Sequence, residues 1–270
     1  MNLTGRVSAV IQEHEVLCDN IYSMWVQTEL SSHAKPGQFF QVFVPDRSKL
    51  LGRPISICEI DQDRKSVRFV YRTNGPKSGT QCISRLQTGD HIEIMGPYGN
   101  GFPIEESSDK HVLVIGGGIG IPPLVEVAKQ CKSVSAVVGY AQDTFLTKEL
   151  SLYADLHITT EDGSHGIKGN VMAVLDHISQ YITVDAQRFL DSNALVFFAC
   201  GPSPMLRAVA ELAESQDIPC YVSVEERMAC GIGACLACVC ETKELDSYSQ
   251  VHNRRVCKEG PVFLSTEVML

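Results

Sequence analysis

Four cysteines in the last part of the sequence restrict its possible structures more than any other feature. Cys230, Cys235 and Cys238 follow the spacing C-x4-C-x2-C, and Cys257 supplies a fourth thiol farther along. This is the spacing that holds a plant-type [2Fe–2S] cluster. The glycines and alanines between these cysteines leave room for backbone amides to point at the sulfurs. We therefore predict a one-electron centre with these four cysteines as its ligands.

Two other interpretations of the cysteine pattern stay open at this point. Cys240 competes with Cys257 for the fourth ligand position, and we interpret Cys240 as a non-ligand. A structural zinc ion also takes four thiolates, although its usual pattern consists of two paired C-x2-C knuckles. A Rieske centre is disfavoured, because no histidine accompanies the cysteines closely in the sequence.

The composition sets broader limits on what the protein does. Its 270 residues are 44% hydrophobic and 20% charged, which is ordinary for a chain of about two globular domains. The net charge of −9 argues against nucleic acid or an anionic membrane as a partner. No apolar run approaches the ~18 residues of a spanning helix, and residues 1–6 lack the apolar segment of a signal peptide. We expect a soluble cytoplasmic protein.

Eleven cysteines are many for a cytoplasmic protein, but we do not interpret them as a disulfide framework. The chain is much larger than a typical disulfide-rich secreted domain, and four of the cysteines crowd into residues 230–240. The scattered cysteines have mostly apolar neighbours and are expected to be small core residues. These are Cys18, Cys58, Cys82, Cys131 and Cys220.

Residues 1–102 have the pattern of an all-β domain. Short runs of β-prone residues alternate with turn signals such as Lys35-Pro36-Gly37 and Thr88-Gly89-Asp90. Many short strands at this spacing predict a small antiparallel barrel. The predicted strands span residues 7–10, 21–28, 38–44, 55–60, 66–72 and 91–95.

Residues 103–224 have the pattern of an α/β domain, which begins after a polar linker at residues 105–110. Strands alternate with helices, and this alternation predicts a parallel sheet covered on both faces. Apolar residues at helical spacing predict helices over 171–178 and 206–213, with Ser203 as the N-cap of the second. The predicted strands span residues 111–115, 134–139, 155–159, 194–199 and 219–224.

Residues 225–270 form a third unit, which is rich in cysteine and glycine and has little helical periodicity. The predicted fold class is therefore multi-domain β plus α/β. It consists of an antiparallel β-barrel, a parallel-sheet α/β domain and a small C-terminal domain that binds the cluster.

A glycine-rich loop follows the strand predicted at residues 111–115 and precedes a predicted helix. Such a loop lets backbone amides and the helix dipole hold a pyrophosphate. The sequence departs from the G-x-G-x-x-G fingerprint and follows G-x-G-x-G-x-x-P, which resembles the loop of ferredoxin-reductase-like NAD(P) domains. The matching residues are Gly116, Gly118, Gly120 and Pro123. The alternative is a tight turn that binds nothing.

A second loop, Cys200-Gly201-Pro202, follows the strand predicted at residues 194–199. It resembles the C-G-P motif that approaches the nicotinamide in the same family, and open α/β sheets bind ligands at the carboxyl ends of their strands. The alternative is that Cys200 is a core cysteine. We expect NAD as the cofactor, because the loops at 139–143 and 159–163 offer acidic residues and no arginine for a 2′-phosphate.

The barrel region contains Arg53-Pro54-Ile55-Ser56, which resembles the R-x-[YFIL]-S flavin motif of ferredoxin-reductase-like proteins. The arginine fork suits the FAD pyrophosphate, and the serine suits the N5 edge of the isoalloxazine. The resemblance also places residues 96–99 in a loop that closes the barrel beside the flavin. It assigns further FAD contacts to Val70, Tyr71, Arg72, Gly79 and Thr80. The alternative is that Arg53 and Arg72 are surface charges.

Along the chain the motifs follow the order R-P-I-S, G-G-G-I-G, C-G-P and C-x4-C-x2-C…C. In this order they resemble the electron transfer subunits of class 1B dihydroorotate dehydrogenases, over essentially the whole chain. Residues 225–240 and 256–263 are especially similar. The resemblance implies FAD in the barrel, NAD in the α/β domain and [2Fe–2S] in the C-terminal domain. It also implies a separate FMN-containing catalytic subunit that oxidises dihydroorotate, in a heterotetramer of two plus two.

Electrons would then pass from FMN through the cluster and FAD to NAD⁺, in de novo pyrimidine biosynthesis. FAD suits the middle place, because it exchanges one electron with a cluster and two with nicotinamide. The chain has no evident site for dihydroorotate, so we expect the catalytic residues on the partner.

Two alternatives to this function remain. Related subunits with the same three cofactors serve sulfhydrogenases, anaerobic sulfite reductases and ferredoxin–NADP oxidoreductases, and the partner distinguishes them. A nucleotide-sensing or scaffold module with a structural zinc belongs to another class, but it leaves the flavin motif unexplained.

Overall fold

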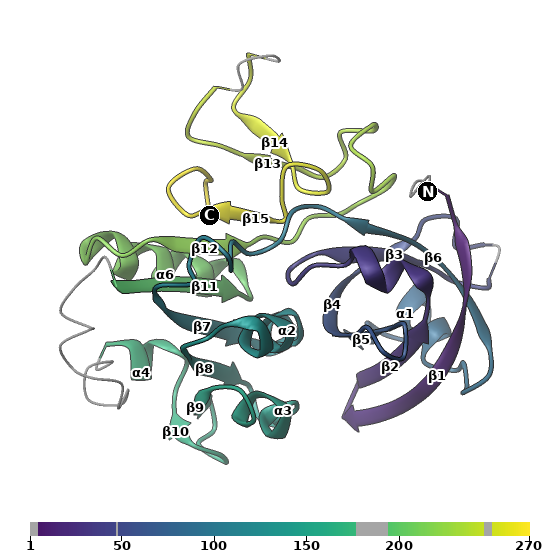
Figure 1. The fold of residues 1–270 in the computed structure, drawn as a ribbon, viewed down its shortest axis with the longest axis horizontal. Helices are drawn as coiled ribbons and strands as arrows, with labels where there is room; N and C mark the ends of the chain where they lie inside the picture. Colours follow the sequence, from purple (N-terminus) through teal and green to yellow (C-terminus); the bar gives the residue numbers. More distant parts are fainter. Residues whose placement is uncertain (1–4, 47, 177–193, 246–249) are drawn as a thin grey trace.

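The computed structural model describes residues 5–46, 48–176, 194–245 and 250–270. Figure 1 shows a barrel beside an α/β part, with the C-terminal segment (residues 225–270, yellow-green to yellow) lying across the same end of both. The predicted fold class is confirmed: a closed antiparallel barrel is followed by a mainly parallel sheet. No described helix is long and apolar enough to cross a membrane.

The barrel closes in the strand order β1-β2-β5-β4-β3-β6. Alternate residues of its strands point inward, where Phe40 and Phe69 meet edge to face with ring centroids 5.6 Å apart. The first strand is longer than the predicted 7–10, because it continues as a hairpin arm that turns at Asn20. The strands are β1 (Val7–Cys18), β2 (Ile21–Gln27), β3 (Phe39–Phe43), β4 (Arg53–Asp61), β5 (Ser66–Arg72) and β6 (His91–Tyr98).

Two short helices accompany the barrel, and both begin at a side-chain cap. The 3₁₀ helix η1 (Glu29–His33) begins after Thr28, whose side chain accepts a hydrogen bond from the Leu30 amide. The helix α1 (Gly79–Ile83) begins after Ser78, whose side chain accepts from the Gln81 amide at 3.1 Å. The second helix starts at the predicted glycine–threonine pair, so its first amides face the flavin motif.

The α/β part is a seven-stranded sheet in the order β10-β9-β8-β7-β11-β12-β15. Its strands pair in parallel, except that β15 is antiparallel to β12. The strands are β7 (His111–Gly117), β8 (Val134–Tyr140), β9 (Asp155–Thr160), β10 (Ile167–Lys168), β11 (Leu195–Cys200), β12 (Cys220–Ser223) and β15 (Val262–Leu264).

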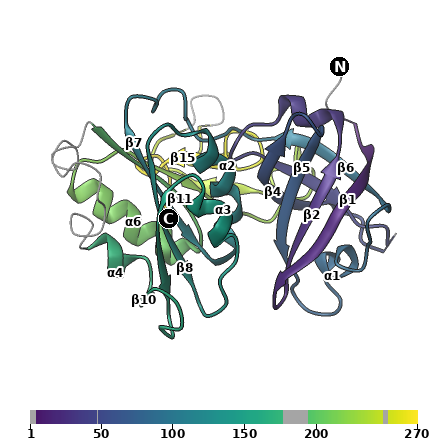
Figure 2. The same ribbon diagram turned by 60° about the horizontal axis from the view of Figure 1, so that its bottom comes forward.

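Helices cover both faces of this sheet, as predicted (Figure 2). On the face toward the barrel, Val112 and Val114 of β7 pack with Leu124 and Leu150 of the covering helices. On the other face, Leu113 of β7 packs in a separate core with residues of α4 and α6. The helices are α2 (Pro122–Gln130), α3 (Thr147–Ser151), α4 (Met172–Leu175) and α6 (Ser203–Ser215), and a 3₁₀ turn, η2 (Gly118–Gly120), precedes α2.

Details of two predicted helices change in the structure. Ser203 is not the N-cap, because the Pro202 carbonyl already accepts the first helical bond, from the Leu206 amide at 3.0 Å. The helix over 171–178 is described only as α4, and Ile178 lies outside the described residues.

The scattered cysteines are partly as predicted. Cys58 and Cys220 are buried core residues, whereas Cys18, Cys82 and Cys131 are only partly buried at the edges of their cores. Apolar neighbours in the sequence do not determine whether a cysteine is buried, because burial depends on which element packs over it.

The C-terminal segment forms a two-stranded ribbon from β13 (Val239–Glu241) and β14 (Asn253–Arg255), and then adds β15 to the sheet. The predicted unit at 225–270 therefore shares its last strand with the α/β part. Asn100, just after β6, fastens the segment to the barrel: its amide donates to the carbonyls of Glu259 and Val262 at 3.0 and 2.7 Å. The Asn100 carbonyl accepts from the Val262 amide at 3.0 Å.

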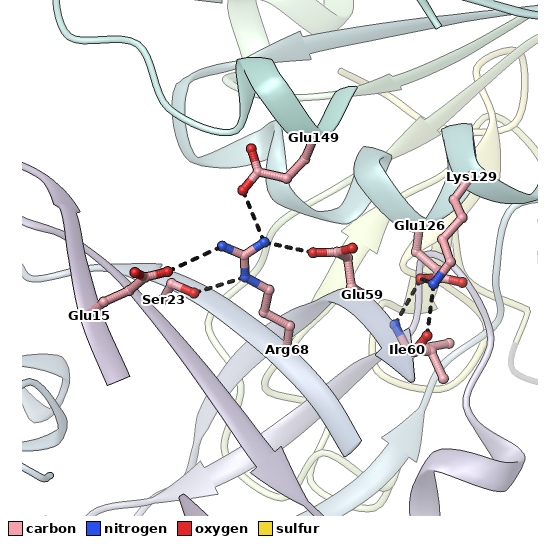
Figure 3. A network of polar contacts seen from close by, with 8 residues as sticks. All are labelled: Glu15, Ser23, Glu59, Ile60, Arg68, Glu126, Lys129 and Glu149. Carbon is pink, nitrogen blue, oxygen red and sulfur yellow. Dashed lines mark hydrogen bonds and ion pairs between the residues drawn. The ribbon is translucent and has the colours of Figure 1, made fainter. Parts of the chain in front are cut away.

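Arg68 connects the barrel to the helices that face it (Figure 3). Its side chain is 7% exposed and donates to Glu59 at 2.6 Å within the barrel and to Glu149 of α3 at 3.2 Å. Its Nε donates to Ser23 Oγ at 2.8 Å. A buried arginine is tolerated only when its charge and donors are matched in this way.

Glu126 of α2 strengthens the same interface. Its carboxylate accepts from the Ile60 amide at 2.8 Å, and Lys129 donates to the Ile60 carbonyl at 2.9 Å (Figure 3). Both backbone polar groups of Ile60, near the end of strand β4, are therefore bonded to side chains of α2. These bonds hold the barrel and the α/β part in a fixed orientation.

We predict that Arg68→Met lowers the free energy of unfolding by about 3 kcal/mol, because it leaves the buried Glu59 carboxylate without its partner. Arg64→Met is the matched control, since Arg64 pairs with Glu13 at the surface and the loss is at most about 1 kcal/mol. Urea titrations of the two variants measure the difference, and equal losses would contradict the importance of the buried network.

Candidate functional site

The loop from Cys230 to Cys238 folds so that its backbone amides surround the first cysteine. Gly231 and Gly233 have positive φ values of 71° and 81°, a conformation that glycine adopts without strain. Burial opposes ionisation of Cys230, but the amides of Ile232, Cys235 and Ala234 and the Cys235 thiol lower its pKa to about 6. The loop is thus shaped to stabilise a thiolate.

Cys238 and Cys257 form a second pair behind the first. Both are buried in the core that also contains Phe39 of the barrel, and the Cys257 amide donates to Cys238 Sγ at 3.4 Å. Burial and the neighbouring Cys238 raise the pKa of Cys257 to about 12. Cys230 also acts electrostatically on Cys257, so the structure brings the four predicted ligands together.

The arrangement in two pairs fits a [2Fe–2S] cluster, in which each of two irons takes two thiolates. Within the described ranges, no three cysteine, histidine or acidic side chains surround a point that a single metal ion would occupy. A structural zinc would instead need all four thiolates around a single point. Cys240 lies on β13, half-buried against the core, and its place in the ribbon is compatible with the predicted non-ligand role.

At the flavin motif, Arg53 lies directly over the start of α1. A Cβ placed on Gly79 would be only 2.3 Å from Arg53 Nε, so a larger residue here would displace the guanidinium. The cation and the first amides of α1 therefore meet at one point, which suits a phosphate group. Thr80, in the first turn, is half-buried beside the Ser78 hydroxyl at 3.2 Å.

The structure separates the other predicted flavin residues into two groups. Arg72 is exposed, and Pro54 and Ser56 are partly exposed, so their side chains are free to contact a ligand. The side chains of Ile55, Val70 and Tyr71 are buried, which leaves their backbone as the accessible part. The Tyr71 hydroxyl is bonded to His14 Nε2 at 2.8 Å inside the barrel, and burial raises its pKa strongly.

The two predicted nucleotide loops lie side by side, at the carboxyl ends of the adjacent parallel strands β7 and β11. A Cβ on Gly120 would be 2.4 Å from the Cys200 carbonyl oxygen, and one on Gly201 would be 3.1 Å from the Gly117 nitrogen. Glycine at both positions therefore allows the loops to touch. The chain leaves β7 toward β8 on one side and reaches β11 on the other, and such a switch point is where open α/β sheets bind ligands.

Arg72 joins the flavin region to the nucleotide loop. A Cβ placed on Gly118 would be 3.3 Å from Arg72 Nη2, although the two residues belong to different parts of the fold. Half-buried Cys200 stands at the end of β11, where burial raises its pKa to about 12, so it is neutral at pH 7. The exposed Pro202 then begins α6.

The two acidic loops are neighbours at the same edge of the sheet, since the Glu161 amide donates to the Tyr140 carbonyl at 3.1 Å. Asp162 accepts from the Ser164 amide at 2.9 Å, and this bond lowers its pKa. The stem of Lys168 packs over Gly163. The acidic residues Asp143, Glu161 and Asp162 are exposed, which agrees with the predicted preference for NAD over NADP.

Two family models match the chain. Residues 8–102 match an oxidoreductase FAD-binding domain, and residues 225–269 match the iron-sulfur cluster binding domain of dihydroorotate dehydrogenase B. The match limits agree with the barrel and with the C-terminal segment.

Whole-chain relatives decide the family. The chain is 37% identical to the electron transfer subunit of dihydroorotate dehydrogenase B (NAD(+)) from Geobacillus kaustophilus, over 99% of this chain and 100% of the relative. It is 42% identical to the subunit from Streptococcus thermophilus, over 97% of each chain. The chain belongs to the family of dihydroorotate dehydrogenase B electron transfer subunits.

Solved structures show the same fold at lower identity. The NADH-dependent reduced ferredoxin-NADP oxidoreductase superposes with a TM-score of 0.82 at 24% identity, over 100% of this chain and 91% of that one. A ferredoxin NADP⁺ reductase from Neisseria gonorrhoeae, with bound FAD and NADP, gives 0.64 at 14% identity, over 78% of this chain and 91% of that one. The chain therefore shares the barrel and sheet of these two structures.

For the cluster, we predict that Cys235→Ser abolishes cluster binding, whereas Cys240→Ser retains it. The first change removes one member of the Cys230–Cys235 pair, and the second alters a ribbon residue outside both pairs. Iron and sulfide content with the electron paramagnetic resonance (EPR) spectrum of the reduced proteins measures the outcome. Loss of the cluster in Cys240→Ser, with its retention in Cys257→Ser, would exchange the roles of the two cysteines.

For the flavin, we predict that Arg53→Ala lowers FAD occupancy at least tenfold at limiting FAD, because a charge-assisted contact to the pyrophosphate is lost. Arg64→Ala is the control, since Arg64 lies at the surface and pairs with Glu13. Flavin content after gel filtration measures occupancy. Equal occupancy in the two variants would show that Arg53 does not hold the pyrophosphate.

Proposed function

We propose that this chain is the electron transfer subunit of an NAD-dependent dihydroorotate dehydrogenase that acts in the cytoplasm. Its partner is an FMN-containing catalytic subunit, and two copies of each form a heterotetramer. Electrons that the partner takes from dihydroorotate reach NAD⁺ through this chain, in the pathway that makes pyrimidine nucleotides. Two observations support the proposal. The curated relatives that match nearly the full chain are named as electron transfer subunits of this enzyme, and the three sites lie in the order that electron transfer requires.

The order of the sites is the observation that carries the proposal. The cluster loop and the flavin motif both contact one side chain, Gln41, through Gly231 and Gly52. On the other side, Arg72 lies against Gly118 of the nucleotide loop. The flavin region is therefore in contact with both of the other sites, as a path from cluster to nucleotide requires.

Each group of residues has a separate task along this path. Arg53 and the first amides of α1 bind and orient the FAD pyrophosphate, and the glycine loop does the same for the NAD pyrophosphate. The amides around Cys230 stabilise its thiolate and keep the ligand loop in place. When bound, the cluster carries single electrons and the flavin links these to hydride exchange with nicotinamide.

A partner surface is available at the cluster loop. Cys235 is exposed, and the apolar side chains of Ile232 and Leu236 beside it are 48% and 60% exposed. Apolar side chains exposed next to a redox centre are typical of a protein interface. A subunit docked here would bring its own flavin close to the cluster.

The ferredoxin–NADP oxidoreductase alternative has support from the fold, because the matching structure covers the whole chain. The relatives from Geobacillus kaustophilus, Streptococcus mutans and Streptococcus thermophilus, at 37, 39 and 42% identity, are dihydroorotate dehydrogenase B electron transfer subunits, which favours the pyrimidine pathway. The identity of the partner separates the two functions.

We predict that the complex isolated from its native cells reduces NAD⁺ with dihydroorotate and contains stoichiometric FMN in the partner. Cys235→Ser removes at least 99% of this activity, while NADH-driven dye reduction through FAD persists, because dye reduction does not use the cluster. Flavin analysis of the separated subunits and the two assays measure this.

Isolation of the chain in a complex with a hydrogenase or a sulfite reductase would show that it acts in another pathway. Loss of dye reduction in Cys235→Ser, at unchanged FAD content, would contradict the proposed order of the sites.

A further inference from the structure

Gln41 is a buried polar residue that the sequence analysis did not single out. It lies on β3 and is 0% exposed, yet neither Nε2 nor Oε1 has a hydrogen-bond partner among the described residues. Leaving a buried donor or acceptor unpaired lowers the stability of a protein. The burial of both polar atoms of Gln41 therefore indicates a role that the protein fold alone does not explain.

The Gln41 side chain lies between two of the candidate sites. A Cβ placed on Gly231, which directly follows Cys230, would be 2.8 Å from Gln41 Nε2. A Cβ placed on Gly52, which directly precedes Arg53, would be 2.5 Å from Gln41 Oε1. The amide group therefore points its nitrogen toward the cluster loop and its oxygen toward the flavin motif.

Tyr98 is a second polar residue whose buried hydroxyl has no partner among the described residues, and it lies opposite Phe39, two residues before Gln41 on β3. It is on β6, the strand that pairs with β3, where it faces Phe39 with ring centroids 6.0 Å apart. The Tyr98 hydroxyl is buried and has no hydrogen-bond partner within the described part of the chain. The phenol lies close enough to Cys230, the first residue of the cluster loop, for the two side chains to interact electrostatically.

The chemistry of the two groups fits sulfur ligands. Thiolates and sulfides of a cluster are anionic acceptors and have no proton to donate. A carboxamide NH₂ and a phenol hydroxyl are donors, and both come from the barrel side of the Cys230 loop. Arg68, a buried polar residue elsewhere in the barrel, has its partners Ser23 and Glu59 within the protein.

We propose that Gln41 and Tyr98 donate hydrogen bonds to the cluster sulfurs on the Cys230 side and thereby raise the reduction potential of the cluster. Both are positioning residues, since they act on the cluster through its sulfurs. Hydrogen bonds to the sulfurs stabilise the reduced form more than the oxidised form, because the reduced cluster carries more negative charge. The proposal rests on the cluster assignment made under the proposed function.

Two substitutions remove the donors without changing size. Gln41→Leu replaces the amide by an apolar group of similar volume, and Tyr98→Phe deletes one oxygen. The matched controls are Gln130→Leu, whose amide bonds Glu126 at the far interface, and Tyr153→Phe at the surface of the α/β part. All variants are prepared as the chain loaded with FAD and cluster.

The potential of the cluster is measured by redox titration followed by EPR. We expect Gln41→Leu to make cluster reduction about tenfold less favourable, a shift of about 59 mV for one electron. Tyr98→Phe shifts the potential in the same direction, and the controls leave it unchanged. Proton electron–nuclear double resonance (ENDOR) in H₂O and D₂O gives a second readout: each variant loses one exchangeable proton coupled to the cluster.

An unchanged potential with unchanged exchangeable protons in both variants would overturn the proposal while leaving the cluster assignment intact. A wild-type chain that binds no cluster would instead overturn the proposed function. If Gln41→Leu does not assemble a cluster, Tyr98→Phe decides the question, because it removes a single atom and keeps the ring that packs on Phe39.

Discussion

The attachment of the C-terminal segment to two different parts of the fold is the constraint on which the rest of the structure depends. Asn100 binds the segment to the barrel through both its amide and its carbonyl, and β15 binds it to the sheet through β12. With both attachments in place, Cys238 and Cys257 enter a core that includes Phe39 of the barrel. The cluster loop contains no described helix or strand of its own, so its position depends on this packing. Electron transfer in turn requires that the cluster loop lie close to the flavin region.

Glycine determines where the parts of the molecule touch. Gly79 accommodates Arg53, Gly120 accommodates the Cys200 carbonyl, and Gly231 accommodates Gln41. A Cβ at each of these glycines would lie within 2.3–2.8 Å of an atom of the neighbouring residue, and each glycine lies at a candidate cofactor site. The fold thus uses its glycines to bring charged groups and amides close to the places where phosphates and sulfurs are expected.

Local patterns of the sequence predicted much of this arrangement. The cysteine spacing and the glycine loop depend on neighbouring residues of one backbone segment, so their positions could be read directly. The Arg68 network could not, because its partners Ser23, Glu59 and Glu149 are brought together only by packing of the barrel on α3. The N-cap at Ser203 was wrong by one residue, since proline at 202 already accepts the first helical bond.

The flavin motif shows the limit of prediction by resemblance. The resemblance assigned Arg53 and Gly79 to flavin phosphates, and the structure places the two residues side by side, but the motif gave no sign that the Tyr71 hydroxyl is bonded to His14. Gln41 lacked any signal, because a glutamine in a strand is usually solvated. Only its complete burial without a partner distinguishes it from an ordinary surface residue.

The central claim is that the flavin region lies between the nucleotide loop and the cluster loop. Rapid mixing of the loaded chain with NADH, followed by flavin absorbance and by freeze-quench EPR of the cluster, tests this order most directly. The account predicts that the flavin is reduced first and the cluster signal rises afterward, at a rate that depends on the flavin. A cluster signal that precedes flavin reduction, or that rises in protein without FAD, would contradict it.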